Sequence, residues 1–394
     1  MKKIVTFCAV LTLALAMSIM FVSCGGDKSG NSGNPDNPNN PDNPGGGIVP
    51  VPPISVSNEL EWIATTAIIK ASGNNKSYTI NVTDDLSLPG DDSTAVYNFG
   101  STENITVTID GSGKSITRTS AGFLFNINSK QTFIIKDISL DGNGIDIDKP
   151  LVCVSYSSTA FIMQGAASVT GANSYGNSAI EVTNGTFTME DSSTVQGNIN
   201  RGLYGGGVKM NGGTFTMKDN SRLYNNKADG GGGIRIAGGA KVIMENNAEI
   251  SGNQATASSL GRGGGVQLLD GTFTMKDSAK VSGNTASLGG GVLIDGGTFN
   301  MYDESVVSGN TATGTLDYLG GGGGVYVQTG AFRFISGTVY GNNASTELKN
   351  TVTGSGATGA ALYIKAGSTA ERGTYNGNTW TSSGTLTTTD STIN

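Results

Sequence analysis

A repeated phrase constrains this chain more than any other feature. The segment 289–312, GGGVLIDGGTFNMYDESVVSGNTA, recurs with the same internal spacing through most of the sequence. In most copies a Phe follows an apolar residue by seven positions, as in Val266/Phe273 and Val292/Phe299, and in one copy Val242 takes the place of the Phe. A Gly or Asn follows ten positions later, and an Asn usually comes next. These Asn residues are Asn198, Asn226, Asn253, Asn284, Asn310 and Asn342. A fixed period of about 20 to 50 residues is the signature of a stacked-repeat architecture.

Apolar residues alternate with polar ones inside each copy, which predicts short β-strands. Phe299 and Met301, for example, are separated by Asn300. The strands end at Gly, Asn or Asp, which tolerate the positive φ values of sharp corners. Three such strands would form one coil, and a coil buries its inner face only by stacking on its neighbours. We therefore predict an all-β fold, a right-handed parallel β-helix of about ten coils with the Phe residues in its core.

The first 57 residues do not have this pattern. Residues 1–23 begin with two lysines and continue with an apolar run, which is typical of an export signal. The sequence Phe21-Val22-Ser23-Cys24 resembles a bacterial lipobox, and this resemblance implies that Cys24 carries a lipid. Residues 24–57 consist mostly of Gly, Asn, Asp and Pro, a composition that favours a disordered tether between anchor and fold.

Residues 58–394 are predicted to form the β-helix domain, with clear repeats over residues 151–378. A short capping helix is expected over residues 58–72, because Asn58 and Glu61 form a capping-box-like start and Gly73 follows its end. Its apolar face is expected to contain Leu60, Ile63, Ala64, Ala67 and Ile68. Such a helix would cover the open first coil, since the end units of a solenoid need a covered edge.

Several copies are alike enough to resemble a known family. GGGVKMNGGTFTMKD, GGGVQLLDGTFTMKD and GGGVLIDGGTFNMYD, each closed by an SGN-type turn, look like the parallel β-helix repeats of bacterial surface proteins. They are similar to the glycine-rich and Phe/Asn repeats of the polymorphic outer membrane proteins. The resemblance covers residues 151–378 strongly and 98–150 weakly. It implies a right-handed β-helix exposed at the bacterial outer membrane or cell surface.

The residue types argue against several kinds of chemistry. The chain contains no His, which removes His-based triads and most zinc sites. Asp141, Asp146 and Asp148 offer oxygen ligands, but their spacing is not that of an EF-hand loop, so no metal and no cofactor are expected. Residues 110–115, DGSGKS, imitate the end of a phosphate-binding loop, yet no helix pattern follows and a tight turn is expected. A net charge of −7 argues against nucleic acid as a partner.

The remaining functional signal is the length of the connections between copies. The connection after the Gly/Asn turn is short from Gly283 to Val292 and longer after Gly252, Gly309 and Gly341. All of these insertions are expected at one corner, and insertions on one edge of a solenoid often build its binding face. The candidate partner-binding residues at this corner are Arg262, Leu316, Tyr318, Leu319 and Lys349.

These observations favour a non-enzymatic surface or envelope protein that is anchored in the membrane by its N-terminal lipid. Its β-helix would present a binding or adhesive edge to a host protein or a glycan, and no catalytic residue is assigned. Two alternatives stay open. A carbohydrate-active enzyme, of the polysaccharide lyase or glycosidase type, would need carboxylates and basic residues clustered on one wall. A passive structural spacer would have no specific ligand.

Overall fold

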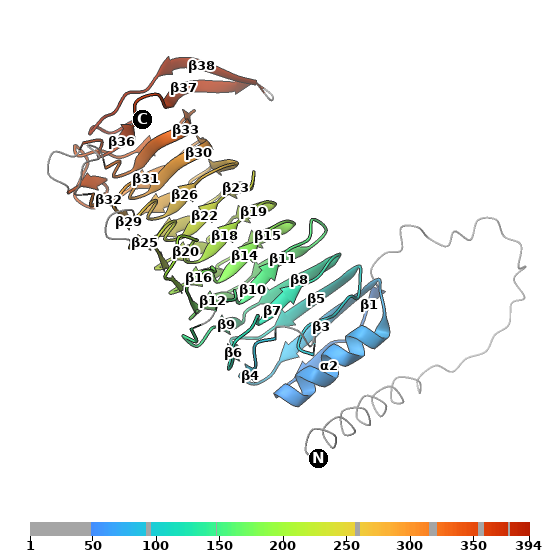
Figure 1. Cartoon of the computed structure of the whole chain (residues 1–394). Coiled ribbons are helices and arrows are strands. Elements are labelled where there is room, and N and C mark those ends of the chain that lie inside the picture. The colour runs from blue at the N-terminus through green and yellow to red at the C-terminus, as the bar shows by residue number, and fades with distance from the viewer. Residues whose placement is uncertain are drawn as a thin grey trace, which may run out of the picture.

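The computed structural model describes residues 49–91, 96–146, 148–256, 261–314, 321–353, 358–376 and 379–394. They form a parallel β-solenoid whose turns stack from the N-terminal to the C-terminal end (Figure 1). One wall has ten strands, one for each turn, and the helix α2 (Glu59–Ser72) lies at the N-terminal end. The predicted all-β parallel β-helix of about ten coils with an N-terminal helix is therefore confirmed.

Three walls surround the core, which we call the wide, the ten-strand and the narrow wall. The wide wall contains β1 (Val49–Pro50), β2 (Ile54–Val56), β3 (Lys76–Val82), β5 (Ile105–Asp110), β7 (Phe125–Ile127), β8 (Gln131–Lys136), β10 (Val152–Val154), β11 (Ala160–Gln164), β14 (Ile180–Val182), β15 (Thr186–Met189), β18 (Val208–Met210), β19 (Thr214–Met217), β22 (Ile234–Ile236), β23 (Lys241–Met244), β26 (Val266–Leu268), β27 (Thr272–Met275), β30 (Val292–Met301), β33 (Val325–Phe334), β36 (Leu362–Ile364), β37 (Thr369–Asn376) and β38 (Thr379–Thr385). The ten-strand wall contains β4 (Leu86–Leu88), β6 (Ser115–Arg118), β9 (Ser139–Asp141), β12 (Ser168–Thr170), β16 (Thr194–Gln196), β20 (Arg222–Tyr224), β24 (Glu249–Ser251), β28 (Lys280–Ser282), β31 (Val306–Ser308) and β34 (Thr338–Val339). The narrow wall contains β13 (Asn173–Ser174), β17 (Ile199–Asn200), β21 (Lys227–Ala228), β25 (Gln254–Ala255), β29 (Thr285–Ala286), β32 (Thr311–Ala312) and β35 (Thr351–Val352).

A central turn contains four strands, whereas the sequence predicts three. The first two lie end to end in the wide wall, as β14 and β15 do, and in β30 and β33 they are a single ten-residue strand. The fourth strand, in the narrow wall, has two residues in each turn, for example Ile199–Asn200. Two residues are too few for an alternating pattern, so this strand leaves no periodic signal in the sequence.

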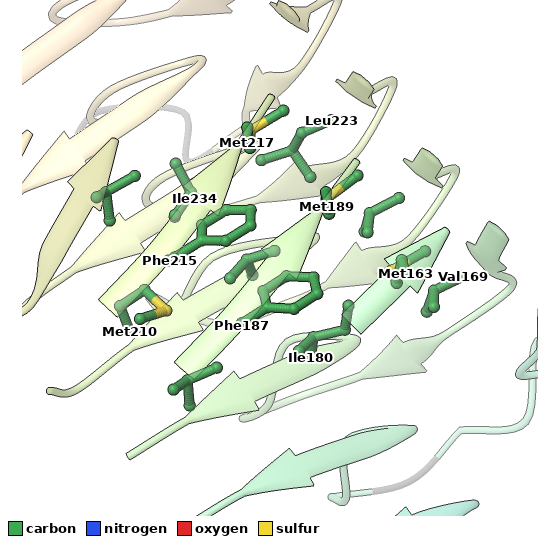
Figure 2. Close-up of a cluster of buried hydrophobic side chains, with 14 of the residues drawn as sticks. Met163, Val169, Ile180, Phe187, Met189, Met210, Phe215, Met217, Leu223 and Ile234 are labelled. Carbon is green, nitrogen blue, oxygen red and sulfur yellow. The ribbon is translucent and has the colours of Figure 1, made fainter. Parts of the chain in front are cut away.

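The predicted Phe column is the centre of the core. Phe187 pairs in register with Phe215, their ring centroids are 4.4 Å apart, and both side chains are fully buried. Figure 2 shows these rings between the Met and Ile side chains of neighbouring turns. The column is interrupted at Val242, which pairs with Phe215 on one side and Phe273 on the other. Because each turn repeats the same inward residues at the same positions, the core continues along the whole stack.

Buried Asn residues connect the turns where the ten-strand wall ends. The Nδ2 of Asn226 donates to the Oδ1 of Asn253 at 3.0 Å and to the carbonyl of Val195 at 3.0 Å. Every residue of this ladder is fully buried: Asn198, Asn226, Asn253, Asn284, Asn310 and Asn350. Since each amide is bonded to both neighbouring turns, no buried polar group of the ladder's central residues lacks a partner.

The last position of the Asn ladder corrects the sequence prediction. Asn350 accepts from the N–H and the Nδ2 of Asn310, each at 2.9 Å, whereas the predicted Asn342 is exposed. The backbone N–H of Asn342 instead donates to the carbonyl of Asp390 at 2.7 Å. Residues 341–349 are thus an insertion that precedes the ladder Asn, and spacing alone placed the turn too early.

Acidic residues with positive φ form the corner between the wide and the ten-strand walls. Asp219 has a φ of 57° and Asp277 a φ of 54°, in the left-handed region that Asn and Asp tolerate better than most residues. Their carboxylates bond along the stack, since the Oδ2 of Asp219 accepts the N–H of Asp191 at 3.1 Å. The N–H of Asp277 similarly donates to Asp303 at 2.9 Å. These acids therefore have a structural role.

The N-terminal cap differs from the prediction in which helix face it buries. Asn58 caps α2 by accepting the N–H of Glu61, and Gly73 ends the helix with a φ of 79°, as expected. The buried apolar side chains are Trp62, Ala64 and Ile69, whereas Leu60 is 55% exposed. The prediction is confirmed for Ala64 and wrong for Leu60, because Trp62, which has the largest apolar surface, packs with its ring centroid 5.8 Å from that of Phe125 and sets which face is buried.

The folded unit also begins before Asn58. Val49 pairs with Lys76 and Ile54 with Ile80, so β1 and β2 lie side by side with β3. Residues 49–56 therefore belong to the solenoid, and the predicted tether of residues 24–57 extends too far in this part. Residues 24–48 lie outside the described residues. Within the described ranges, no helix is long and apolar enough to cross a membrane.

A hairpin and the chain end close the other end of the solenoid. Strands β37 and β38 pair antiparallel, and Figure 1 shows them beyond the last parallel strands. The final residues then lie against the last turn, where Thr389 pairs with Leu362 and the buried Ile393 pairs with Val339. Terminal units are expected to be atypical, and here an antiparallel cap replaces a further parallel turn.

Candidate functional site

The long connections between turns lie mainly on one edge of the solenoid. We call the segments that run from the narrow wall to the wide wall the insertion edge. The register of Thr311 with Thr351 and of Ala312 with Val352 places the start of the segments after β32 and β35 on this edge, where residues 313–314, 321–324, 353 and 358–361 are described. The segment 341–349 precedes β35 and lies on the other side of the narrow wall. The expectation that all insertions share one corner is therefore wrong for this segment.

Exposed large apolar side chains gather at the insertion edge and on the narrow wall beside it. Seven such side chains are exposed in the described residues, and four of them lie here. They are Tyr175 and Leu203, each 60% exposed, Ile199, 41% exposed, and Tyr204, 39% exposed. Two neighbouring turns supply them, since Asn173 pairs with Ile199 and Ser174 with Asn200. This region therefore combines aromatic and aliphatic surface that is available for contact.

Cations hold both tyrosine rings in place. The guanidinium of Arg201 lies 4.4 Å from the ring centroid of Tyr175 and 2.8 Å from the carboxylate of Asp146. The Nζ of Lys209 lies 4.5 Å from the ring centroid of Tyr204, and the guanidinium of Arg235 lies 5.1 Å from it. Cation–π contacts of this kind fix the orientation of an exposed ring. The rings are thus positioned before any partner arrives.

The cations beneath Tyr204 differ in their charge environment. Lys209 forms an ion pair of 2.9 Å with Glu181. Burial lowers the pKa of the Arg235 guanidinium, although the nearby Tyr204 opposes this shift. No carboxylate in the described part of the chain forms an ion pair with Arg235. The next residue in this row, Gln267, is buried and its Oε1 has no hydrogen-bond partner there. The outer face of the wide wall is therefore polar and positively charged at this point.

Farther along the same row the outer face becomes apolar. Leu293 and Tyr326 follow Gln267 in register and pack with Leu288 in a second hydrophobic cluster outside the coil interior. The ring of Tyr326 stacks on that of Tyr363 at 5.0 Å. The sequence signal for this cluster is a large apolar residue in the middle of VLI, VYV and LYI, because the three preceding copies have Lys, Arg and Gln at this position.

Of the predicted binding residues, Arg262 and Lys349 lie in the described part of the chain. Arg262 is on the insertion edge, where its backbone forms isolated β-bridges with Gly230 and Leu288. Its side chain forms an ion pair of 3.1 Å with Asp295. Lys349 directly precedes the ladder residue Asn350, on the other side of the narrow wall. The structure therefore does not bring these two residues onto the same edge. Leu316, Tyr318, Leu319 and the lipidation candidate Cys24 lie outside the described residues.

Sequence reasoning missed Tyr175, Leu203 and Tyr204. The connection that contains Leu203 and Tyr204 is short, so connection length gave no reason to select it. The available signal was composition: each of these residues is a large apolar side chain in a segment of Gly, Asn and Arg.

Charged residues on the wide wall pair with one another from turn to turn. Asp110 contacts Lys136 at 2.8 Å, Glu190 contacts Lys218 at 2.6 Å, and Glu245 contacts Lys276 at 2.7 Å; these pairs stabilise neighbouring strands. Burial raises the pKa of Asp110, but the hydrogen bonds from Lys136 and Ser112 and the charge of Lys136 together outweigh it, so that this pKa is lowered. A general acid needs a raised pKa, so the lowered pKa of Asp110 does not suit this role.

The potential metal ligands of the described residues do not form a cluster. Asp146 forms an ion pair with Arg201. The described ranges contain no group of three or more Cys, Asp or Glu that could hold a metal ion.

Comparisons with known proteins add no further assignment. No protein-family model, no curated protein and no solved structure matches this chain.

Proposed function

We propose that this protein is a lipid-anchored, non-catalytic protein of a bacterial outer membrane or cell surface, and that its insertion edge binds a host protein or a glycan. The observation that carries the proposal is the concentration of exposed aromatic and aliphatic side chains on this edge and on the narrow wall beside it. Aromatic and Arg residues dominate the binding energy of many interfaces. Tyr175, Tyr204 and Arg201 provide this combination, and the cations already hold the rings in position.

The place where the chain enters the fold supports an N-terminal anchor. The described chain begins with β1 and α2 at one end of the solenoid, and the insertion edge runs along its side (Figure 1). A lipid on Cys24, followed by a flexible segment rich in Gly, Asn and Pro, would hold this end near the membrane. The side walls would then face outward, where a partner can reach them.

The paired charges of the wide wall support the non-catalytic proposal over the alternative of a carbohydrate-active enzyme. Hydrolysis of a glycosidic bond requires two carboxyl groups that face one scissile bond and have different protonation states. Glu190 and Glu245 each contact a lysine of a neighbouring turn, and these contacts raise the pKa values of Lys218 and Lys276 through hydrogen bonds. Carboxylates that are paired with lysines in this way hold neighbouring turns together.

A binding assay with matched variants tests the proposal. The full chain is applied to arrays of extracellular matrix proteins and of glycans, and is compared with the triple variant Tyr175→Ala, Leu203→Ala, Tyr204→Ala. The control is Thr188→Ala, Thr216→Ala, Thr274→Ala, which removes outward side chains from the wide wall. Loss of the aromatic residues should weaken binding by about thirtyfold or more, since hot-spot residues contribute about 2 kcal/mol or more.

A third variant lacks residues 314–319 and tests the predicted residues Leu316, Tyr318 and Leu319. Reduced binding by this variant would extend the binding surface to these residues. If the full chain binds an array component and all variants bind it equally, the insertion edge has no binding role. If the full chain binds no component of either array, the passive-spacer alternative is favoured.

A further inference from the structure

A second candidate site lies at the opposite edge of the wide wall, where the chain turns into the ten-strand wall. The connections here have nearly constant length. Between the register-matched positions Gln164 and Ser168 there are three residues, and the same number separates Glu190 from Thr194 in the next turn. The turn that contains Lys136 and Ser139 has only two, residues 137–138.

This short connection leaves a notch in the edge. The turn before it has four residues in the same place, 111–114, so a long connection and a regular one flank the short one. The notch is a cavity of about 420 Å³. Its lining comes from three successive turns: Ser112, Gly113, Lys114, Asp137, Ile138, Ser139, Ala166 and Ser168. Its volume lies within the range of about 300–1,000 Å³ that is common for small-molecule sites.

The backbone of the first lining segment does not bind phosphate, although its sequence imitates a phosphate-binding loop. The N–H of Ser112 donates to the carboxylate of Asp110, that of Gly113 to the carbonyl of Asp137, and that of Lys114 to the carbonyl of Gly111. This confirms the predicted tight turn. Because these amides are already bonded within the fold, they are not available for an anion. The side chains of this turn face the notch instead.

The side chains of the notch offer both donors and acceptors. Lys114 has three N–H donors and forms no ion pair with any carboxylate in the described ranges. The Oδ1 of Asp137 already accepts the N–H of Ala166 at 2.8 Å, so its Oδ2 is the oxygen offered to a ligand. Ser112, Ser139 and Ser168 provide hydroxyl groups, of which that of Ser112 already donates to Asp110 at 3.3 Å. Ser168 donates to Ser139 at 2.8 Å, which leaves the hydroxyl hydrogen of Ser139 available. The exposed Ala166 adds apolar surface between these groups, whereas the side chain of Ile138 is buried in the core behind them.

The charge around the notch favours a neutral ligand. Two cations, Lys114 and Lys136, are near three carboxylates, Asp85, Asp110 and Asp137. Hydrogen bonds from Ser115, together with the charge of Lys114, lower the pKa of Asp85, so this carboxylate is ionised at neutral pH. Two positive against three negative charges do not attract an anion. A ligand with several neighbouring hydroxyl groups satisfies alternating donors and acceptors without adding a charge.

We propose that this notch, lined by Lys114, Asp137 and the three serines, binds a neutral sugar residue. Vicinal hydroxyl groups would accept from Lys114 and donate to Asp137, and the carbon face of the ring would lie against Ala166. The site is separate from the insertion edge, because it lies where the wide wall meets the ten-strand wall. The two proposals therefore succeed or fail independently.

The test uses saturation-transfer difference NMR on the full chain. The probes are the methyl glycosides of glucose, galactose, mannose and N-acetylglucosamine at about 10 mM, since an open notch is expected to bind with millimolar affinity. At least one glycoside should receive saturation from the protein. Ala166→Phe should fill the notch and reduce this signal about tenfold, and Lys114→Met should reduce it by removing the ammonium group.

The matched control is Ser192→Phe. Ser192 is exposed and occupies the corner position of Ala166 one turn further along, but it does not line the notch. Both Phe variants are first compared by circular dichroism, to confirm that they keep the β-structure. The proposal requires that Ser192→Phe retains the signal that Ala166→Phe loses.

Three outcomes contradict the proposal. One is that none of the four glycosides receives saturation, and another is that Ala166→Phe leaves the signal unchanged. The third comes from phosphorus NMR with inorganic phosphate: broadening that depends on Lys114, without a glycoside signal, assigns the notch to anions.

Discussion

The side-chain amide of Asn226 lies in the middle of a continuous row, with its Nδ2 3.0 Å from the Oδ1 of Asn253 in the next turn. The Oδ1 of Asn226 in turn accepts from both the N–H and the Nδ2 of Asn198, at 3.1 and 3.0 Å. Hydrogen bonds in such a row polarise one another in a buried, weakly screened environment. The repeated Asn is therefore a component of the fold that joins successive turns.

Asn253→Ala should destabilise the protein more than a surface change of equal size. The substitution leaves the N–H of Asn226 and one of its two Nδ2 hydrogens without an acceptor, and each unpaired buried donor costs about 1–3 kcal/mol. Denaturant unfolding measures the change. The control is Asn247→Ala, at an exposed position whose φ is not positive. Equal midpoints for the two variants would contradict the importance of the ladder.

Phe273→Asp should unfold far more of the protein than Thr274→Asp. Phe273 is fully buried, and its ring lies 4.9 Å from that of Phe299, whereas Thr274 is on the outer face. Even Phe→Ala in a core costs about 3–5 kcal/mol, and a buried carboxylate adds to this, whereas surface changes stay within about 0.5 kcal/mol. Circular dichroism and limited proteolysis report the difference. Similar losses in both variants would reverse the assignment of inside and outside.

Acid should loosen the N-terminal cap. Hydrogen bonds from Ser57, the nearer from its N–H at 2.7 Å, lower the pKa of Glu61 below its usual 4.5. A lowered pKa in the folded state means that the carboxylate stabilises the cap above about pH 4.5. This contribution is lost as the pH falls through the lower, folded-state value.

The emission of the buried Trp62, in a Trp380→Phe background, follows the cap during this titration. Glu61→Gln should reduce the thermal stability of the cap at pH 7 and flatten its dependence on pH between about 5 and 3. If Glu61→Gln keeps the full pH dependence of the unmodified protein, a group other than Glu61 causes the loosening of the cap.

Cys24→Ala should release the protein from the membrane. An acyl anchor partitions into detergent micelles, and the described part of the chain has no helix that could replace it. In a Triton X-114 separation the variant is expected in the aqueous phase, while the unmodified protein stays in the detergent phase. If both partition alike, Cys24 is not the anchor.

The sequence predicted those parts of the fold that every turn repeats. The Phe column could be read from spacing, because Phe215, Phe273 and Phe299 occupy one inward position in successive copies. The narrow wall could not, since two residues per turn have no period. The change from Asn342 to Asn350 also left no sequence signal, because both positions hold the same residue type and the difference depends on the path of the inserted loop.

The candidate sites were less predictable for a similar reason. Loop length identified the insertion edge, but it could not select Tyr204, whose importance comes from the cations beneath it in two neighbouring turns. The notch depends on the difference between connections in three turns, and no single copy contains that information. Sites of this kind arise from how unequal turns lie next to each other.

The repeated register has a consequence for how the length of this protein can change. The segment TFTMKD occurs at residues 214–219 and again at 272–277, so recombination between these copies would add or remove whole turns. Each junction would still bring a core apolar residue to its partner and a ladder Asn to the next Asn. One added turn would lengthen the protein by about 4.8 Å without a new kind of contact. The length of the solenoid is therefore a quantity that gene duplication can adjust in fixed steps.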